Sequence, residues 1–347
     1  KNTVCLTRET HAFLSQHIGD LENLATYEFF EMTITHLKRV LSIEPEIIAH
    51  DMHPNYLSTR YAMEQGHRVR IDVQHHHAHI VSCMAENHVE EPVIGLAFDG
   101  TGYGSDGSIW GGEVLIARLD GFERAAHLAY TPMPGGAAAI KEPWRMAVSY
   151  LYGAYGNDLF NRRLPFLEKL NEGKLNIIIE MIEKEINSPR TSSLGRFFDG
   201  IAAMLGIRSH VAFEGQAAME LEMMAETWAG DLYDTAWSSE EPIQIDPRPI
   251  VTGVVTDIEK GVPPSLVSGK FHATLMKLFT DLCQVIRKKT GLSQVALSGG
   301  CFQNAILLAG LSRRLGDRGF DVLTHENVPA NDGGIALGQA VIADAIV

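Results

Sequence analysis

The sequence has few of the residues that mark secreted, disulfide-bonded or membrane proteins. It contains 4 cysteines in 347 residues, widely spaced at positions 5, 83, 283 and 301, and no two of them form a CxxC pair. This spacing argues against a zinc ribbon or a disulfide framework and suits a reducing cytoplasm. No apolar run approaches the roughly 18 residues that cross a bilayer, and the first residues show no signal-peptide pattern. We therefore expect a soluble, cytoplasmic protein with no membrane partner.

Basic residues are also scarce. Lysine and arginine total 29 against 43 aspartates and glutamates, which gives a formal net charge of −14. The longest basic run is Arg287–Lys289, whereas a protein that holds a nucleic-acid backbone usually carries a basic stripe. Nucleic acid is therefore not an expected partner. The composition, with 45% hydrophobic and 21% charged residues, is that of an ordinary globular protein with room for two lobes.

Two parts of the chain repeat one order of elements. In the first part the elements are strand 46–51, helix 56–65, strand 68–73 and helix 75–86. In the second part they are strand 294–297, helix 305–315, strand 320–324 and a closing helix that ends near 345. Each part follows a long amphipathic helix, at 24–41 and 271–290, and each lobe begins with antiparallel strands, clear at 93–98 and 109–119 and weaker at 3–7. The alternation of strands and helices predicts parallel sheets.

A duplicated unit of this kind is the plan of the actin-like ATPase, sugar kinase and heat-shock protein fold. We expect an α/β protein with two duplicated lobes around a nucleotide cleft. Lobe I is predicted at 1–90 and lobe II at 91–347, with a helical insertion at about 142–237 and a proline-rich connector at 240–264. Parallel sheets bind ligands at the carboxyl ends of their strands. Equivalent loops of the two lobes should therefore meet at one ligand.

Two histidines at helical spacing are the first candidate site. His75 and His79 are four residues apart, so on a helix both can present nitrogen to one metal ion. Spacing alone leaves open a solvated, histidine-rich helix start. The equivalent loop of the other lobe carries Asp332, which can complete a metal site across the cleft and favours the metal interpretation. His76 and His77 point elsewhere and are candidates for neighbouring or phosphate contacts.

Two glycine-rich segments are candidates for binding an anion. A tight turn is predicted at 99–104, where Gly100, Thr101 and Gly102 let backbone N–H groups approach a phosphate; a flexible hairpin is the alternative. Asp99 either contacts a metal or the phosphates, or makes a structural turn.

The second glycine-rich segment spans 298–304. Gly299 and Gly300 precede a helix N-terminus, which favours anions. Asn304 either contacts the nucleoside or caps that helix. Cys301 has no activating base nearby in the sequence, so a packed thiol is expected rather than a nucleophile.

The predicted insertion adds three residues to the candidate nucleotide site. The planar fork of Arg196 suits a phosphate or a carboxylate. Glu214, next to Gly215, can bind ribose hydroxyls. For the two charged residues, an ordinary surface ion pair is the alternative.

Eight segments occur in order along nearly the whole chain. They are HDMHPNYLSTRYA (50–62), VQHHHAH (73–79), FDGTGYGSDGSIWGGE (98–113), KEPWRMA (141–147), TSSLGRFFDG (191–200), FEGQAAMELE (213–222), LSGGCFQN (297–304) and PANDGGIALGQ (329–339). Together they resemble the C-terminal region of the HypF-type hydrogenase-maturation carbamoyltransferases. The paired histidines and the late aspartate also resemble the tRNA threonylcarbamoyl-adenosine synthase. The chain lacks the CxxC motifs and the adenylate-forming segment of full-length members, so it looks like part of a longer protein.

The resemblance implies a reaction. In this family an upstream domain makes carbamoyl-adenylate from carbamoyl phosphate and ATP. The domain seen here then passes the carbamoyl group to the C-terminal cysteine of HypE, for the cyanide ligands of nickel–iron hydrogenases. Carried over by motif, His75, His79 and Asp332 would hold iron or zinc, with magnesium possible at the phosphates. The 99–104 turn would face the phosphate and Gly299, Gly300 and Asn304 the adenosine, while His76 would assist deprotonation of the thiol.

Other functions remain open. A small-molecule kinase of the same fold would need an aspartate aligned with the γ-phosphate and no paired-histidine metal site. An O-carbamoyltransferase acting on a small hydroxylated metabolite differs only in its acceptor. A nucleotide-regulated scaffold would bind the nucleotide without turnover.

Overall fold

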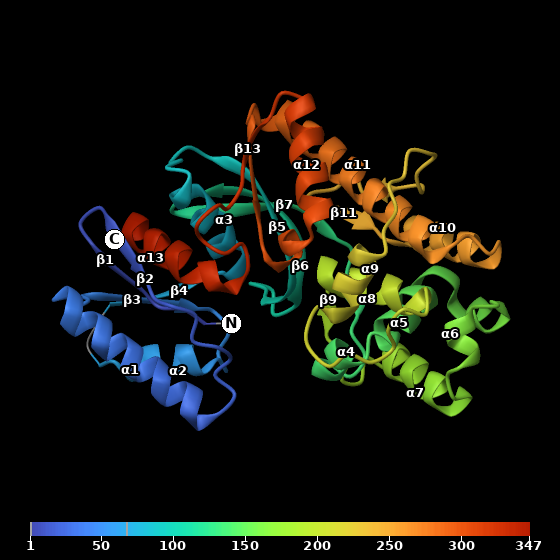
Figure 1. The fold of residues 1–347 in the computed structure, drawn as a ribbon, viewed down its shortest axis with the longest axis horizontal. Helices are drawn as coiled ribbons and strands as arrows, with labels where there is room; N and C mark the ends of the chain where they lie inside the picture. The colour runs from blue at the N-terminus through green and yellow to red at the C-terminus, as the bar shows by residue number, and fades with distance from the viewer. Residues whose placement is uncertain (1, 67–68) are drawn as a thin grey trace.

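The computed structural model describes residues 2–66 and 69–347 and is built around one mixed sheet. Its strands lie in the order β10-β11-β7-β6-β5-β12-β13, while β9 pairs with β6 and β8 pairs with β9. Their bounds are β5 Val93–Tyr103, β6 Ile109–Arg118, β7 Gly121–Leu128, β8 Thr131–Pro132, β9 Arg190–Thr191, β10 Ala236–Trp237, β11 Ile243–Asp246, β12 Gln294–Ser298 and β13 Asp321–Leu323. The central strand, β5, pairs antiparallel with β6 and parallel with β12. It therefore joins the hairpin to the parallel part of the sheet (Figure 1).

The side chains of β5 alternate between the two faces of this sheet. On one face Phe98 is buried against Phe279 and Phe302, with ring centroids 4.3 and 5.2 Å apart. On the other face a side chain at Gly95 would lie 2.6 Å from Ile80, so this glycine lets a helix approach closely. The sheet is thus buried on both sides, as parallel sheets require.

Helices cover both faces. The face that carries Phe98 packs against α5 Trp144–Tyr155, α8 Leu194–Met204, α10 Arg248–Glu259, α11 Pro264–Thr290 and α12 Ala305–Asp317. The opposite face packs against α3 His75–Glu86, and α13 Ile335–Ile346 lies on α3. The short helix α4 Ala137–Lys141 directly precedes the predicted insertion. The insertion also contains η1 Gly156–Asn161, α6 Pro165–Glu168, α7 Glu172–Glu183 and α9 Gln216–Met223.

The residues before α3 form two small sheets. β1 Cys5–Arg8 and β2 His11–Leu14 form an antiparallel hairpin, and β3 Ile47–Asp51 pairs parallel with β4 Val69–Val73. Helices α1 Leu24–Leu41 and α2 Leu57–Glu64 belong to the same part of the chain. The C-terminal helix α13 contacts β1 and β3, so segments from the two ends of the chain lie side by side (Figure 1). The predicted strand 68–73 begins at residue 68, which lies outside the described residues; its remainder forms β4.

The predicted connector at 240–264 is wrong. It contains β11, which extends the main sheet parallel to β7, and the whole of α10. Its prolines mark helix starts rather than a linker. Pro249 and Pro264 stand in the first turns of α10 and α11, where proline is well tolerated. Among residues 2–66 and 69–347, no helix combines the length and apolar character needed to cross a membrane.

Candidate metal and nucleotide site

The start of α3 presents the paired histidines. β4 ends at Val73, and the Gln74 side chain caps the helix by accepting a hydrogen bond from His77 N at 2.9 Å. The amide of Gln74 also donates to Tyr103 O at 3.0 Å, which ties the helix start to the end of β5. One helical turn separates His75 from His79, so both rings point to the same side.

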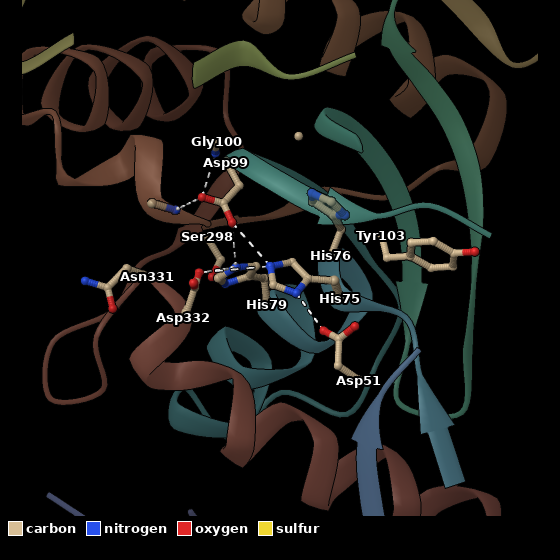
Figure 2. Close-up of polar contacts among 12 residues, drawn as sticks. Asp51, His75, His76, His79, Asp99, Gly100, Tyr103, Ser298, Asn331 and Asp332 are labelled. Atoms are coloured by element: carbon tan, nitrogen blue, oxygen red, sulfur yellow. Dashed lines mark hydrogen bonds and ion pairs between the residues drawn. The ribbon is translucent and has the colours of Figure 1, made fainter. Parts of the chain in front are cut away.

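Two aspartates from different elements meet these rings (Figure 2). Oδ2 of Asp99, on β5, lies 3.3 Å from Nε2 of His75 and 3.3 Å from Nε2 of His79. Oδ1 of Asp332, in the short 3₁₀ helix η3 Asp332–Gly334, lies 3.7 Å from Nε2 of His79 and 4.0 Å from Nε2 of His75. All four ligand atoms lie within 4.8 Å of one another. The structure therefore brings together the three predicted ligands and adds Asp99.

The spacing of these atoms fits a metal ion. A tetrahedral zinc with bonds of about 2.0–2.1 Å holds its ligand atoms about 3.4 Å apart. The two distances from Asp99 to the histidine nitrogens match that separation, and the two distances from Asp332 are slightly longer. Two imidazoles and two carboxylates form a mixed N/O set that suits zinc or iron.

Electrostatics also favour a cation at this point. Burial lowers the pKa of His75, but hydrogen bonds to Asp51 and Asp99 outweigh burial and hold that pKa well above its usual value. Burial raises the pKa of Asp99, but the two histidines outweigh it and hold the pKa well below its ordinary range. The carboxylates thus stabilise positive charge on the protonated histidine rings. A bound divalent cation would provide this positive charge in place of the protons.

Asp99 also links this cluster to the glycine-rich turn after β12. Its Oδ1 accepts hydrogen bonds from Gly100 N at 2.7 Å and from Gly300 N at 3.2 Å. A side chain at Gly300 would lie 2.7 Å from the same oxygen. Both backbone donors hold Oδ1, so Oδ2 is left to face the histidines (Figure 2).

The turn predicted at 99–104 is wrong. β5 continues through the glycines to Tyr103, with an irregular register between Phe98 and Gly102, and the chain reverses only at 104–108. Long-range contacts keep the glycines extended, since Ser193 Oγ donates to Gly100 O at 2.6 Å. A side chain at Gly102 would lie 2.4 Å from the His76 ring. Gly102 is therefore needed for packing against the histidines, and Thr101 lies half-buried in the same strand.

Arg196 is the largest buried side chain beside this strand. It is 2% exposed, its Nη2 lies 3.0 Å from Oδ2 of Asp199, and its Nε and Nη1 have no hydrogen-bond partner among the described residues. Burial raises the pKa of Asp199 to about 6, with Arg196 acting in the opposite direction. A side chain at Gly100 would lie 3.1 Å from Oε1 of Glu214 and 3.4 Å from Nη2 of Arg196. The structure thus gathers Gly100, Arg196 and Glu214 at one place.

The remaining nucleotide candidates lie at the start of α12. Gly299 has a φ of +107°, and a side chain there would lie 2.2 Å from Phe98 O. Asn304 caps α12, accepting from Leu307 N at 2.8 Å, while its amide contacts Nε2 of His272 at 2.9 Å. Both polar atoms of the Asn304 side chain are engaged in these contacts. Of its two predicted roles, the structure shows the one in which Asn304 caps the helix. Gly215 precedes α9 with a φ of +79° and has nothing close to its Cα on the side-chain side.

A cavity adjoins the start of α12. It has a volume of about 400 Å³ and lies between α11, α12 and the segment after α9. Residues that line it include Trp228, Met276, Ile306 and Arg313. Its lining combines apolar side chains with the charged residues Glu226, Arg313 and Arg314.

His76 lies behind the cluster. It is fully buried, and its Nδ1 lies 3.2 Å from the amide nitrogen of Gln74. The Gln74 oxygen is engaged by His77 N, so the amide nitrogen donates and Nδ1 accepts. The proton of a neutral ring is then on Nε2, which has no partner among the described residues. Burial holds the pKa of His76 well below its usual value, which argues against the predicted role of His76 as a base for the thiol.

Two residues of the first lobe were missed in the sequence. Asp51 Oδ2 accepts from His75 Nδ1 at 2.7 Å. Tyr56 stacks on His53 with ring centroids 4.0 Å apart. Tyr56 is 38% exposed, and its partial burial, with nearby acids of which Asp51 is the first, raises its pKa. Asp51 ends the predicted strand 46–51, and this position at the carboxyl end of a parallel strand could have indicated that it belongs to the site.

Comparison with known proteins identifies the chain's relatives. Residues 1–86 match the family model "HypF Kae1-like domain", and residues 95–339 match "Carbamoyltransferase, Kae1-like Domain, second subdomain". "Carbamoyltransferase HypF2" of Cupriavidus necator is 40% identical over 99% of this chain and 45% of its own length. A "Carbamoyltransferase HypF homolog" of the same organism is 35% identical over 99% of this chain and 89% of its own length.

A solved structure agrees with these matches. The crystal structure of a full-length HypF in a phosphate- and nucleotide-bound form has a TM-score of 0.95 and 46% identity, covering 100% of this chain and 54% of that one. This chain thus spans about half the length of several relatives that it matches. The likeness confirms the predicted α/β class and actin-like ATPase type of fold.

Proposed function

This chain belongs to the HypF carbamoyltransferase family, and we propose that it moves a carbamoyl group from carbamoyl-adenylate to the C-terminal cysteine of HypE during hydrogenase maturation. The observation that carries the proposal is that Asp99 contacts both the paired histidines and the glycine-rich turn. One oxygen of this carboxylate faces the paired histidines, and the other is held by the backbone of the glycine-rich turn. The candidate metal ligands therefore lie next to the glycine-rich turn, which we propose binds the anion.

The reaction needs no nucleophile from the chain. The acceptor sulfur forms a bond to the carbamoyl carbon, the bond from that carbon to the adenylate phosphate breaks, and AMP leaves with the electron pair while the thiol proton passes to water. A metal held by His75, His79, Asp99 and Asp332 would supply Lewis-acid stabilisation of an oxygen of the mixed anhydride. None of the 4 cysteines is required for this sequence of bonds.

The chain's own groups bind and orient the adenylate. Two nitrogens of Arg196, Nε and Nη1, have no hydrogen-bond partner among the described residues, and its guanidinium lies beside Gly100, so its fork suits the phosphate. Glu214, on the same side, is placed to accept from the ribose hydroxyls. The cavity between α11 and α12 suits the adenine, because Met276 and Ile306 offer an apolar lining. The proton on Nε2 leaves His76 the role of hydrogen-bond donor and not of base.

The acceptor distinguishes this proposal from its closest rival. An O-carbamoyltransferase would use the same cluster with a hydroxyl acceptor. A kinase of this fold would not require the histidine cluster. The chain spans about half of its longer relatives, and we propose that the adenylate is made by the part it lacks. The chain alone should then bind ATP or AMP without producing carbamoyl-adenylate from carbamoyl phosphate and ATP.

The test is a transfer assay with a defined donor and acceptor. The metal-loaded chain is incubated with carbamoyl-adenylate and HypE, and mass spectrometry should show one added carbamoyl group on the terminal cysteine of HypE. His79→Ala should be severely impaired, whereas Cys301→Ser should stay active because no covalent enzyme intermediate is formed. Carbamoylation of Cys301, or transfer to a hydroxylated metabolite in place of HypE, would contradict the proposal.

A further inference from the structure

A polar stripe runs along α3 beyond its paired histidines. His75, His79, Ser82 and Glu86 follow one another at spacings of four, three and four residues, which places them on one face of the helix. All four face residues 324–334, here called the Asp332 loop (Figure 2 shows the site end of the stripe). The helix that presents the histidines therefore also contacts the segment that presents their partner.

Contacts from the stripe reach both ends of the loop. Asn87, at the C-cap of α3, donates from Nδ2 to Thr324 O at 3.0 Å. Ser82 donates from Oγ to Gly334 O at 2.8 Å. Between these two points the loop turns back toward the cluster and carries Asp332, so its two ends are held by one rigid helix.

Glu86 makes the densest of these contacts. Its Oε1 accepts hydrogen bonds from three successive backbone N–H groups, those of Glu326, Asn327 and Val328. Its Oε2 accepts from Nδ1 of His325 at 2.9 Å. A carboxylate at the C-terminal end of a helix is otherwise unfavourable, because the helix dipole is negative there. The four hydrogen-bond donors of the loop offset the repulsion between the Glu86 carboxylate and the helix dipole. The contact with the loop therefore explains why a carboxylate is found at this helix end.

His325 extends the contact to the main sheet. Because Nδ1 donates to Glu86, Nε2 is the acceptor, and it receives the hydroxyl of Ser298 at 2.8 Å. The order serine, histidine, carboxylate is that of a hydrolase triad. However, Ser298 is 0% exposed at the end of β12, where it lies between the sheet and the Asp332 loop. The chain of hydrogen bonds instead fastens the loop to α3 and to β12 at once.

We propose that Glu86 is a positioning residue for the metal site, which fixes the Asp332 loop on α3 and thereby sets the distance between Asp332 and the paired histidines. This inference rests on the metal site of the proposed function. Residues that orient metal ligands typically change metal affinity by about 10–100-fold when mutated. Removal of the Glu86 carboxylate should therefore weaken metal binding from a distance, although the carboxylate itself is not a ligand.

The test is a double-mutant cycle on zinc affinity, measured by competition of the metal-free protein with a chromophoric chelator. Glu86→Ala should bind zinc about 10–100-fold more weakly than wild type, and Glu86→Gln, which keeps an oxygen for the backbone donors, should recover part of the loss. Glu90→Ala is the matched control, since it removes the same charge from an exposed position near the same helix end. In an Asp332→Ala background, Glu86→Ala should cause no further loss.

Hydrogen exchange supplies a readout that does not depend on metal. Amides of residues 326–328 should exchange faster in Glu86→Ala, while amides in α11 stay protected. Equal zinc affinity in wild type and Glu86→Ala would overturn this inference and leave the metal site standing. An equal further loss in the Asp332→Ala background would also overturn it, because Glu86 would then act through general stability. A wild-type chain that binds neither zinc nor iron would overturn the metal site together with the inference.

Discussion

Asp51 and His75 are joined by a hydrogen bond of 2.7 Å between Oδ2 and Nδ1, from β3 to the first turn of α3. A second oxygen of Asp51 accepts from His53 N at 2.8 Å, so the carboxylate is itself held in place. The bond fixes the His75 tautomer, because a proton on Nδ1 leaves the lone pair of Nε2 for a metal. A carboxylate behind a ligating histidine is the usual arrangement in metal sites.

Asp51→Asn should weaken zinc or iron binding by about 10–100-fold. The amide has nearly the same shape, but it presents a less basic acceptor, or an N–H group, to the His75 ring. Titration of the metal-free protein against a competing chelator measures the change. Asp72→Asn, at an exposed position of the neighbouring strand β4, is the control and should bind as wild type does. Unchanged affinity in Asp51→Asn would remove Asp51 from the site.

Gly102→Ala should damage the cluster by steric overlap. The added carbon would lie 2.4 Å from Cε1 of His76 and 2.7 Å from Cδ2 of His75, distances that force the rings or the strand to move. Overpacking of this kind costs about 1–3 kcal/mol of unfolding free energy, measured by urea denaturation, and metal affinity should fall with it. Gly153→Ala, on an exposed part of α5 with no atom within 4 Å, should be neutral or stabilising. Equal unfolding free energies and equal metal affinities of Gly102→Ala and Gly153→Ala would contradict the prediction, because the histidine rings would then adjust freely to the added carbon.

The parts of the fold that follow from local periodicity were predictable. Apolar spacing predicted a helix at 24–41, and α1 occupies that range, with Asn23 as its N-cap and Ser42 as its C-cap. The strand–helix alternation predicted the pairing of β12 with β13 and of β3 with β4. These elements depend on residues that are close in the sequence, which is why a pattern reveals them.

The missed features depend on contacts between distant residues. The glycines of β5 read locally as a turn, yet Ser193 and the histidine rings hold them extended. From the sequence, Asp99 could be assigned to a metal, a phosphate or a turn. Its position between α3 and Gly300 depends on contacts with residues far away in the chain. Proline content suggested a linker where β11 and α10 form, because the sheet partner of β11 lies over a hundred residues earlier.

Asp199 should make stability depend on pH in the acid range. Burial raises the pKa of this carboxyl to about 6, above an unfolded value of about 3.9. The folded state then binds the proton more tightly, so this group's contribution to the unfolding free energy falls as pH rises from about 4 to 6. Two pKa units correspond to about 3 kcal/mol. Asp199→Asn should be less stable than wild type at pH 4, and the gap should shrink by roughly that amount at pH 7. A constant gap between the two in denaturant titrations would contradict the raised pKa.

Arg196→Lys should weaken nucleotide binding without unfolding the chain. Lysine keeps the charge near Asp199 but loses the fork whose Nε and Nη1 are without partners among the described residues, and a fork suits phosphate better than a single ammonium. Calorimetry with AMP should show affinity lower by about tenfold or more, the order expected for one charged hydrogen bond. Arg208→Lys, at an exposed pair with Glu220, is the control. Equal AMP affinity in both variants would place the phosphate elsewhere.

Asp99→Asn should separate the two roles of this residue. The amide oxygen can still accept from Gly100 N and Gly300 N, as Oδ1 does now, so the strand and the turn should keep their positions. The amide nitrogen would then face the two histidines in place of Oδ2, and a nitrogen that bears two protons cannot bind a metal. Elemental analysis should show strong loss of bound metal in Asp99→Asn, as in His75→Ala, whereas His76→Ala, which removes no ligand, should lose much less. Metal content equal to wild type in Asp99→Asn, with the fold intact by circular dichroism, would reduce the centre to the three ligands indicated by the sequence.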